Sequence, residues 1–233
     1  MLTFPYKKSL WASHIYCFKD EKHSSKKDEL ITHAYDLKNQ GKTSGVADVA
    51  KKNLFESKFD FFNSDLQAVQ ELKSFCEESL MVAVKDANEF DDDFISNLIP
   101  DLRESWTHIT NNNGYHDAHT HLNTSWGGIY YVDAGECGEV EDGDGILRMN
   151  GTNRFYSPIQ YFTLDLSMQY LRHDIADISP EDGVLVIFPA YLLHSATPYV
   201  GEKDRVVISF NSIILPAKGH KMEISAEINQ KSS

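Results

Sequence analysis

Short segments with the composition of β-strands fill most of the second half of the chain. They are rich in β-branched and aromatic residues and cover 103–110, 126–132, 146–150, 159–166, 184–188, 194–198 and 205–215. Turn-forming residues separate several of them, as in Asn111-Asn-Asn-Gly114 and Pro180-Glu-Asp-Gly183. Many short strands with this punctuation predict a β-sandwich or a barrel such as a jelly roll.

The region before residue 100 shows helical spacing instead. One set of apolar residues recurs with the period of a helix and is followed by a glycine: Leu30, Ala34, Leu37 and Gly41. This pattern predicts a helix over 28–40. A second helix is predicted from residue 63 or 64 to Ala87, and Ser64 and Gln67 resemble a capping box at its start. The chain is therefore expected to be mainly β with a helical N-terminal part.

No low-complexity linker divides the chain, so we expect one domain over 1–233. Within it, 1–100 would be a helical support region, 103–215 the jelly-roll core and 216–233 a C-terminal tail. The segment 42–62 is harder to assign. A short helix around 46–52 fits it, and it would serve either as a lid or as a connection.

Composition and charge limit the class of protein. The chain has 233 residues, 41% of them hydrophobic, which is enough to bury a sizeable core. The formal charge of −13 disfavours nucleic acid and anionic membranes, because both partners require a basic surface. No apolar run approaches the about 18 residues of a membrane span. The first residues also lack the pattern of a signal peptide, so we expect a cytoplasmic protein.

The three cysteines, Cys17, Cys76 and Cys137, are scattered along the chain. Their odd number and wide spacing fit reduced thiols and argue against a disulfide framework or a cysteine-based zinc site. The sequence leaves open whether the helical region forms a homodimer.

The motif His119-Thr-His121 carries the strongest functional signal. Side chains at i and i+2 of a strand share a face, so two imidazoles can bind one ion while Thr120 faces away. The strand-like segment 125–132 follows, which places both histidines at a strand end or in the adjoining loop. A third ligand is expected from another strand. With His194 and then Arg205 downstream, the pattern outlines a mononuclear metal site that also holds an anion.

Five segments in order carry a resemblance to a known family. They are His119-Thr-His-Leu-Asn-Thr-Ser-Trp-Gly-Gly-Ile-Tyr-Tyr-Val132, Gly145-Ile-Leu-Arg148, Ile178-Ser-Pro-Glu-Asp-Gly-Val-Leu-Val-Ile-Phe188, His194-Ser-Ala-Thr-Pro198 and Arg205-Val-Val-Ile-Ser209. Over roughly 103–215 the chain resembles the prolyl-hydroxylase-like branch of the iron(II)- and 2-oxoglutarate-dependent oxygenases. It is also similar to bacterial and phage 2-oxoglutarate oxygenases with a His-x-His, a Ser-Gly-(Val/Ile)-Tyr-Tyr strand and a C-terminal Arg…Ser-Phe-Asn. Gly127 stands where serine is usual in that strand.

The resemblance implies a double-stranded β-helix, a cupin-like jelly roll whose mouth holds iron. In such enzymes two histidines and one carboxylate bind Fe(II), and 2-oxoglutarate and dioxygen take the remaining positions. His119 matches the first ligand and His194 the last. His121 falls where the family carboxylate usually stands, so this chain departs from the usual ligand set.

Three interpretations of this departure stay open. His121 is itself a ligand, or Asp117 supplies a carboxylate from the same strand face, or the position is vacant or water-filled and His121 serves another purpose. His116 is expected on the opposite face and is the least expected ligand. Among the histidines without comparable partners, only His108 is set apart, because its strand is able to line the barrel mouth.

Arg205 is the expected anchor of 2-oxoglutarate, because its planar guanidinium matches the geometry of a carboxylate. Ser209 lies four residues on and faces the same side of a strand, so its hydroxyl adds a donor. Tyr131 matches a position that commonly hydrogen-bonds the cosubstrate in the resembling hydroxylases. The alternatives are a surface ion pair of Arg205 with Glu202 or Asp204, and simple packing for Tyr131 and Ser209.

The expected activity is hydroxylation of a small-molecule or protein substrate, coupled to oxidative decarboxylation of 2-oxoglutarate to succinate. The sequence does not identify the substrate, because fold does not determine it. A second hypothesis is a cupin-like three-histidine metal dioxygenase or isomerase that does not use 2-oxoglutarate and has no standing need for Arg205. A third is a jelly roll without activity and with an incidental metal site.

Overall fold

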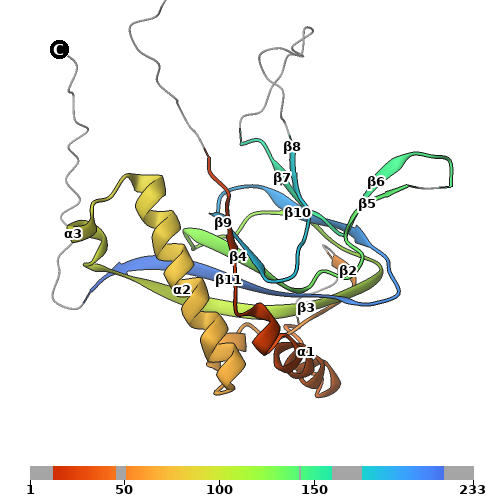
Figure 1. The fold of residues 1–233 in the computed structure, drawn as a ribbon, viewed down its shortest axis with the longest axis horizontal. Helices are drawn as coiled ribbons and strands as arrows, with labels where there is room; N and C mark the ends of the chain where they lie inside the picture. Colours follow the sequence, from red (N-terminus) through yellow and green to blue (C-terminus); the bar gives the residue numbers. More distant parts are fainter. Residues whose placement is uncertain (1–12, 46–50, 142, 159–174, 218–233) are drawn as a thin grey trace, which may run out of the picture.

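The protein is built around one curled antiparallel β-sheet with helices against one face (Figure 1). The computed structural model describes residues 13–45, 51–141, 143–158 and 175–217. Strands of the main sheet lie in the order β1-β9-β4-β11-β3-β10-β7-β8, and β2 pairs with β3. Strands β5 and β6 form a separate hairpin.

The strands that build the main sheet are β1 (Tyr16–Lys19), β2 (Lys51–Glu56), β3 (Leu98–His119), β4 (Trp126–Asp133), β7 (Asn153–Tyr156), β8 (Ile175–Ile178), β9 (Val184–Pro189), β10 (His194–Tyr199) and β11 (Arg205–Pro216). The hairpin consists of β5 (Gly138–Glu141) and β6 (Leu147–Asn150). β3 lies in the middle of the sheet and joins its two halves, because its first part pairs with β11 and its last part with β10.

The helices are α1 (His23–Asn39), α2 (Gln67–Asn88) and the short α3 (Asp92–Ile95), with a 3-10 turn at Phe61–Asn63. The predicted apolar stripes of α1 and α2 are fully buried, as at Leu30 and Leu72. They pack on one face of the sheet in a core that includes Tyr130 and Phe210. Among the described residues, no helix combines the length and the apolar character needed to cross a membrane.

The opposite face of the sheet encloses a second, smaller core. The alternating residues Ile129 and Tyr131 of β4 and Val207 of β11 point into it, and so does Phe188 of β9. Because successive side chains of a strand point to opposite faces, Arg205 and Ser209 share the side of Val207. The inside of the curled sheet is therefore the side on which the predicted site residues gather.

Several predicted elements differ from the structure. Residues 46–50 of the helix expected over 46–52 lie outside the described residues, and its last two residues belong to strand β2 instead, which pairs with β3. Helix α2 starts at Gln67 after the cap residue Leu66, without a side-chain cap, so the capping box of Ser64 and Gln67 was wrong. The hydroxyl of Ser64 instead accepts a hydrogen bond from the backbone N–H of Leu66. The predicted strand 159–166 lies outside the described residues.

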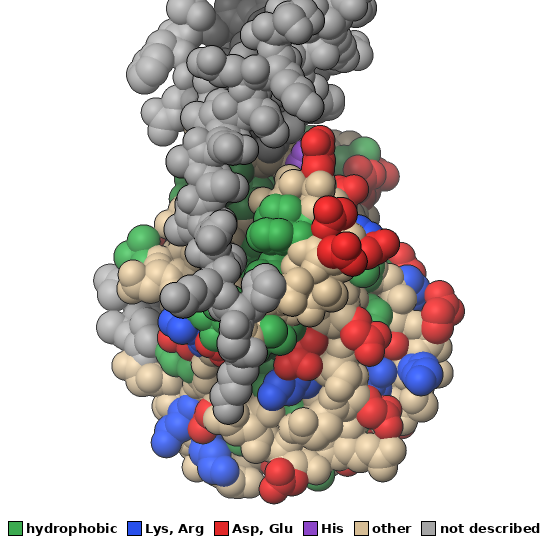
Figure 2. Space-filling model, turned by 90° about the vertical axis from the view of Figure 1, so that its left-hand side faces the viewer, with side chains coloured by type: hydrophobic (Ala, Val, Ile, Leu, Met, Phe, Trp, Pro, Cys, Tyr) green, Lys and Arg blue, Asp and Glu red, His purple; other side chains and the backbone are tan. Residues whose placement is uncertain are grey.

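The acidic character of the sequence is visible on the surface. On the face shown in Figure 2, Asp and Glu side chains gather in the upper part, beside exposed hydrophobic ones. Lys and Arg are more frequent toward the lower part of that view. The negative charge is thus unevenly distributed over this face.

Candidate metal centre

Three histidines converge where β3 ends and β10 begins. His119 and His194 are direct partners in the β3–β10 pairing. His121 follows the strand and is fixed by its backbone N–H, which donates to the carbonyl of Ala190. One nitrogen atom from each imidazole lies within 4.8 Å of the others, and these histidines are the one such group of potential ligands in the described part of the chain.

The hydrogen bonds of the rings determine which nitrogen atoms are free. Nδ1 of His119 lies 2.8 Å from the carbonyl oxygen of Asp117, and Nδ1 of His194 lies 2.9 Å from that of Leu192. A carbonyl only accepts, so both Nδ1 atoms carry the proton and both Nε2 atoms keep a lone pair. Nε2 of His121 lies 3.1 Å from Nε2 of His194. Two nitrogen ligands about 2.1 Å from one ion and at a right angle would be about 3 Å apart.

All three imidazoles are neutral at physiological pH. Burial lowers the pKa of His119 to about 4 and that of His121 to about 4, and in each case a neighbouring histidine lowers it further. Burial also lowers the pKa of His194 to about 3, again with help from His119. A neutral imidazole is the form that binds a metal ion, so the group needs no deprotonation near pH 7.

His116 faces the same side as His119, which corrects the expectation from simple strand alternation. Their ring centroids are 4.1 Å apart. The pairing of β3 with β10 is irregular here, since His119 is opposite His194 and His116 is opposite Ala196. In this β-bulge, three residue positions along β3 span the same length as two along β10. The extra residue returns the side chain of His116 to the inner face of the sheet. Asp117 instead is exposed, and it contributes its backbone carbonyl to the site rather than its carboxylate.

Two of the predicted anion-binding residues, Arg205 and Ser209, line the same pocket as the histidines, and Tyr131 lies beside Arg205. Arg205 is 3% exposed, and its Nη2 donates to Oδ1 of Asn153 at 2.8 Å. The hydroxyl of Tyr131 donates to the same oxygen at 2.8 Å, and the Tyr131 ring lies 5.9 Å from the guanidinium carbon. Burial raises the pKa of Tyr131 despite the opposing charge of Arg205, so the hydroxyl keeps its proton. Among the described residues, Nε of Arg205 is buried without a hydrogen-bond partner, which leaves a charged donor available to a ligand.

The alternative of a surface ion pair for Arg205 is wrong. Among the residues that the structure describes, Asp204 accepts hydrogen bonds from Tyr35 and Asn111 and does not pair with Arg205. Ser209 lines the pocket together with Arg205 and the three histidines. One pocket therefore contains both the group of imidazoles and the buried arginine.

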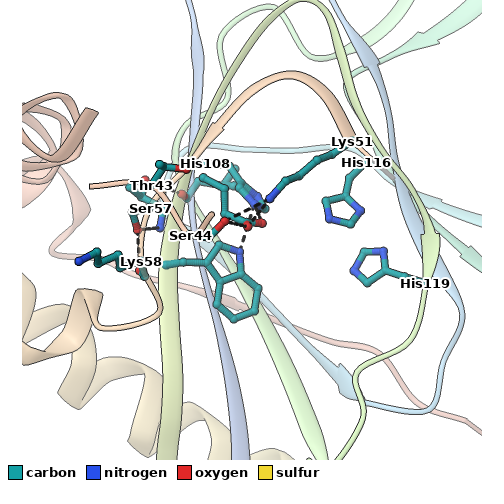
Figure 3. Close-up of polar contacts among 12 residues, drawn as sticks. Thr43, Ser44, Lys51, Ser57, Lys58, His108, His116 and His119 are labelled. Atoms are coloured by element: carbon teal, nitrogen blue, oxygen red, sulfur yellow. Dashed lines mark hydrogen bonds and ion pairs between the residues drawn. The ribbon is translucent and has the colours of Figure 1, made fainter. Parts of the chain in front are cut away.

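A charged network forms the wall of the pocket between β2 and β3 (Figure 3). Glu56 accepts hydrogen bonds from Lys51, from Ser44 and, at 2.9 Å, from Nε2 of His108. Burial alone would raise the pKa of Glu56, but His108 and Lys51 lower it below its usual range. His108 lines the pocket, as the sequence allowed for, and Figure 3 shows His116 and His119 side by side beyond this network.

Comparison with protein families identifies the domain. Residues 104–211 match the family model described as "Putative 2OG-Fe(II) oxygenase". The matched range contains all three histidines, Arg205 and Ser209. Residues 104–211 belong to the 2OG-Fe(II) oxygenases. The protein is therefore an enzyme of the non-haem iron oxygenases that use Fe(II), 2-oxoglutarate and dioxygen, and its substrate is not identified.

Solved structures share the fold of this oxygenase domain. A prolyl-4-hydroxylase from Pseudomonas putida is 12% identical, with a TM-score of 0.53 and coverage of 86% of this chain and 92% of that one. A prolyl hydroxylase from Trichoplax adhaerens is 13% identical, with a TM-score of 0.53 and coverage of 85% and 83%. HygX from Streptomyces hygroscopicus is 9% identical, with a TM-score of 0.52 and coverage of 90% and 85%. The predicted double-stranded β-helix with a helical N-terminal part is thus confirmed. Comparison with curated proteins found no match.

Sequence reasoning missed two features of the oxygenase site. Asn153 joins Tyr131 to Arg205, yet the short segment around it has no alternating pattern that would have predicted β7. Glu56 and Lys51 belong to a segment that was expected to start as a helix. Their proximity to His108 depends on the pairing of β2 with β3, for which the sequence gives no local signal.

Proposed function

We propose that this oxygenase hydroxylates a C–H bond of its substrate at an Fe(II) centre held by His119, His121 and His194. The observation that carries the proposal is the convergence of these imidazoles in one pocket with a buried arginine. In this proposal Arg205, with Ser209, binds the distal carboxylate of 2-oxoglutarate. Asp117 is exposed, which favours His121 over Asp117 as the third ligand.

The donor set fits the proposed metal. Imidazole is a ligand that suits iron, and three neutral imidazoles on one side of an ion leave its other positions for a chelating acid and dioxygen. When bound, the iron centre would couple oxidative decarboxylation of 2-oxoglutarate to succinate and CO₂ with insertion of an oxygen atom into a C–H bond. The protein residues supply position, charge and exclusion of water.

Each residue of the anion-binding group has a separate task in this proposal. The unpaired Nε of Arg205 donates to the cosubstrate, while Nη2 stays fixed by Asn153. Ser209, two positions along the strand from Val207, adds a hydroxyl donor from the same face. Tyr131 is the third member of the group and stabilises the guanidinium through its ring and through Asn153.

The pocket wall excludes water from the proposed centre. Ile129, Phe188 and Val207 line it, and each is buried. The low polarity of this side of the pocket, opposite to the charged network at β2, strengthens the charge interaction between Arg205 and a bound carboxylate.

Two solved structures with this fold were determined with different classes of bound molecule. The Trichoplax prolyl hydroxylase was solved with a peptide fragment of hypoxia inducible factor, and HygX with hygromycin B. We therefore propose a peptide or a small molecule as substrate and would assay both classes. The cytoplasmic location stays a prediction, and a measurement of mass in solution would decide whether the chain forms a homodimer.

The proposal is tested with protein loaded anaerobically with Fe(II). We expect 2-oxoglutarate to bind, and succinate to form when oxygen is admitted with peptide and small-molecule libraries. The absence of both binding and succinate under every condition would contradict the proposal. Turnover that persists unchanged in Arg205→Ala would instead support a three-histidine enzyme that does not use 2-oxoglutarate.

A further inference from the structure

Asn211 places a buried acceptor beside the proposed metal ligands. It lies on β11 two positions after Ser209, and therefore on the same strand face. Its side chain is 8% exposed, and Oδ1 has no hydrogen-bond partner in the described part of the chain. Buried polar atoms in proteins are rarely left unpaired, so this oxygen calls for a functional explanation.

The orientation of the Asn211 amide is determined by Glu104. These two residues are opposite each other in the β3–β11 pairing, and Nδ2 of Asn211 donates to Oε2 of Glu104 at 2.8 Å. A carboxylate only accepts, so the amide nitrogen must face Glu104. Oδ1 of Asn211 is therefore turned away from Glu104.

His121 lies over the same part of this strand face. Its ring stacks on that of Trp106, with centroids 6.0 Å apart. Trp106 pairs with Ser209, and the next pair on this face is Glu104 with Asn211. Nδ1 of His119 and Nδ1 of His194 each have a backbone carbonyl as acceptor. No such bond exists for Nδ1 of His121 among the described residues. Oδ1 of Asn211, which lacks a donor, and Nδ1 of His121, which lacks an acceptor, therefore lie over the same part of the sheet.

We propose that Asn211 is the positioning residue for His121. Oδ1 accepts the proton on Nδ1, which fixes the tautomer whose Nε2 lone pair faces the ion, and Glu104 holds Asn211 in place. Such partners of metal-binding histidines orient the ring and raise its basicity. The inference rests on the proposed function, because it requires His121 to be a ligand.

Cobalt(II) serves as the probe, with affinity from calorimetry and the coordination from visible absorption. We expect Asn211→Ala to weaken Co(II) binding by about 10–100-fold, the usual effect of losing such a partner. The paired exchange Glu104→Gln/Asn211→Asp reverses the donor and acceptor between these residues and keeps an acceptor for His121. This double variant should restore most of the Co(II) affinity that Asn211→Ala loses. No such recovery would be expected if Asn211→Ala weakened binding only by removing packing contacts.

A double-mutant cycle tests whether Asn211 acts through His121. In the His121→Ala background, Asn211→Ala should cause no further loss of Co(II) affinity. Equal losses in both backgrounds, or wild-type affinity and spectrum in Asn211→Ala, would overturn the inference while leaving the three-histidine site intact. If the wild-type protein itself binds neither Co(II) nor Fe(II), the proposed function fails as well. Glu104→Ala, a change at an exposed residue, removes the acceptor that orients the Asn211 amide, so it should also weaken Co(II) binding. This variant keeps the test decisive if Asn211→Ala does not fold, and wild-type affinity in Glu104→Ala would contradict the orienting role of Glu104.

Discussion

His116 and His119 present their imidazoles side by side, with centroids 4.1 Å apart, although three positions separate them on β3. The β-bulge opposite β10 produces this relationship. Nδ1 of His116 also lies near the carbonyl of Asp117, at 3.2 Å. The pocket therefore contains an additional imidazole that resembles the proposed ligands in environment but lies outside their group.

This relationship gives a matched control for the metal site. We expect His119→Ala, His121→Ala and His194→Ala each to weaken metal binding by more than about 100-fold, because each removes a ligand. His116→Ala should retain binding within about threefold. Calorimetry with Co(II) or Ni(II) measures all four variants.

Asp117 distinguishes the alternative ligand set. Asp117→Ala removes an exposed carboxylate but keeps the backbone carbonyl that fixes His119, so we expect unchanged metal affinity. A large loss in Asp117→Ala together with normal binding in His121→Ala would show that the carboxylate, rather than His121, completes the site.

Arg205→Lys tests the cosubstrate anchor. Lysine keeps the positive charge but loses the planar fork and the bond to Asn153, so the KM for 2-oxoglutarate should rise by about 10–100-fold. Succinate production at varied 2-oxoglutarate measures it. Arg154→Lys is the matched control, because Arg154 forms a two-bond pair with Asp177 away from the pocket lining. An equal rise in both variants would contradict a specific role for Arg205.

The sequence predicted the parts of the site that follow from local periodicity. Leu30 and Leu72 mark helices by their spacing, and Ser209 shares a face with Arg205 because strands alternate. The position of His116 could not be predicted, because a bulge depends on the pairing with β10. Asn153 was missed for a similar reason: it meets Tyr131 and Arg205 only once β7 lies against β10. Pairing between distant strands is the information that local pattern lacks.

Glu56 should make stability depend on pH. Its pKa in the folded protein is lower than the ordinary value of 4.5, so its ionised form stabilises the fold above pH 4.5 and this contribution is lost as the pH falls. Glu56→Gln should cost about 3 kcal/mol in unfolding free energy at pH 7, because Lys51 loses its buried partner.

The difference between wild type and Glu56→Gln should shrink by about 1.4 kcal/mol per pH unit below 4.5. Urea unfolding at pH 7 and pH 3.5 measures it, with Glu139→Gln on the exposed β5 as control. A difference that stays constant with pH would mean that the charge of Glu56 does not stabilise the fold.

The ring of Phe188 explains why glycine stands at position 127 of β4. A Cβ at this position would lie 2.8 Å from Cζ of Phe188, whose ring packs 4.6 Å from that of His194. Gly127→Ser should therefore lower the unfolding free energy by about 1–3 kcal/mol, as expected for overpacking. Gly143→Ser, where a Cβ meets no atom within 4 Å, should not.

Adding Phe188→Leu tests the cause of this loss. If the phenyl ring occupies the space that serine needs, Gly127→Ser should cost less in the Phe188→Leu background than in the wild type, as measured by urea unfolding. An equal cost in both backgrounds would place the strain elsewhere. Because the same ring packs against His194, a smaller residue at 188 would also loosen the support of that proposed ligand, so glycine at 127 and phenylalanine at 188 are expected to depend on each other.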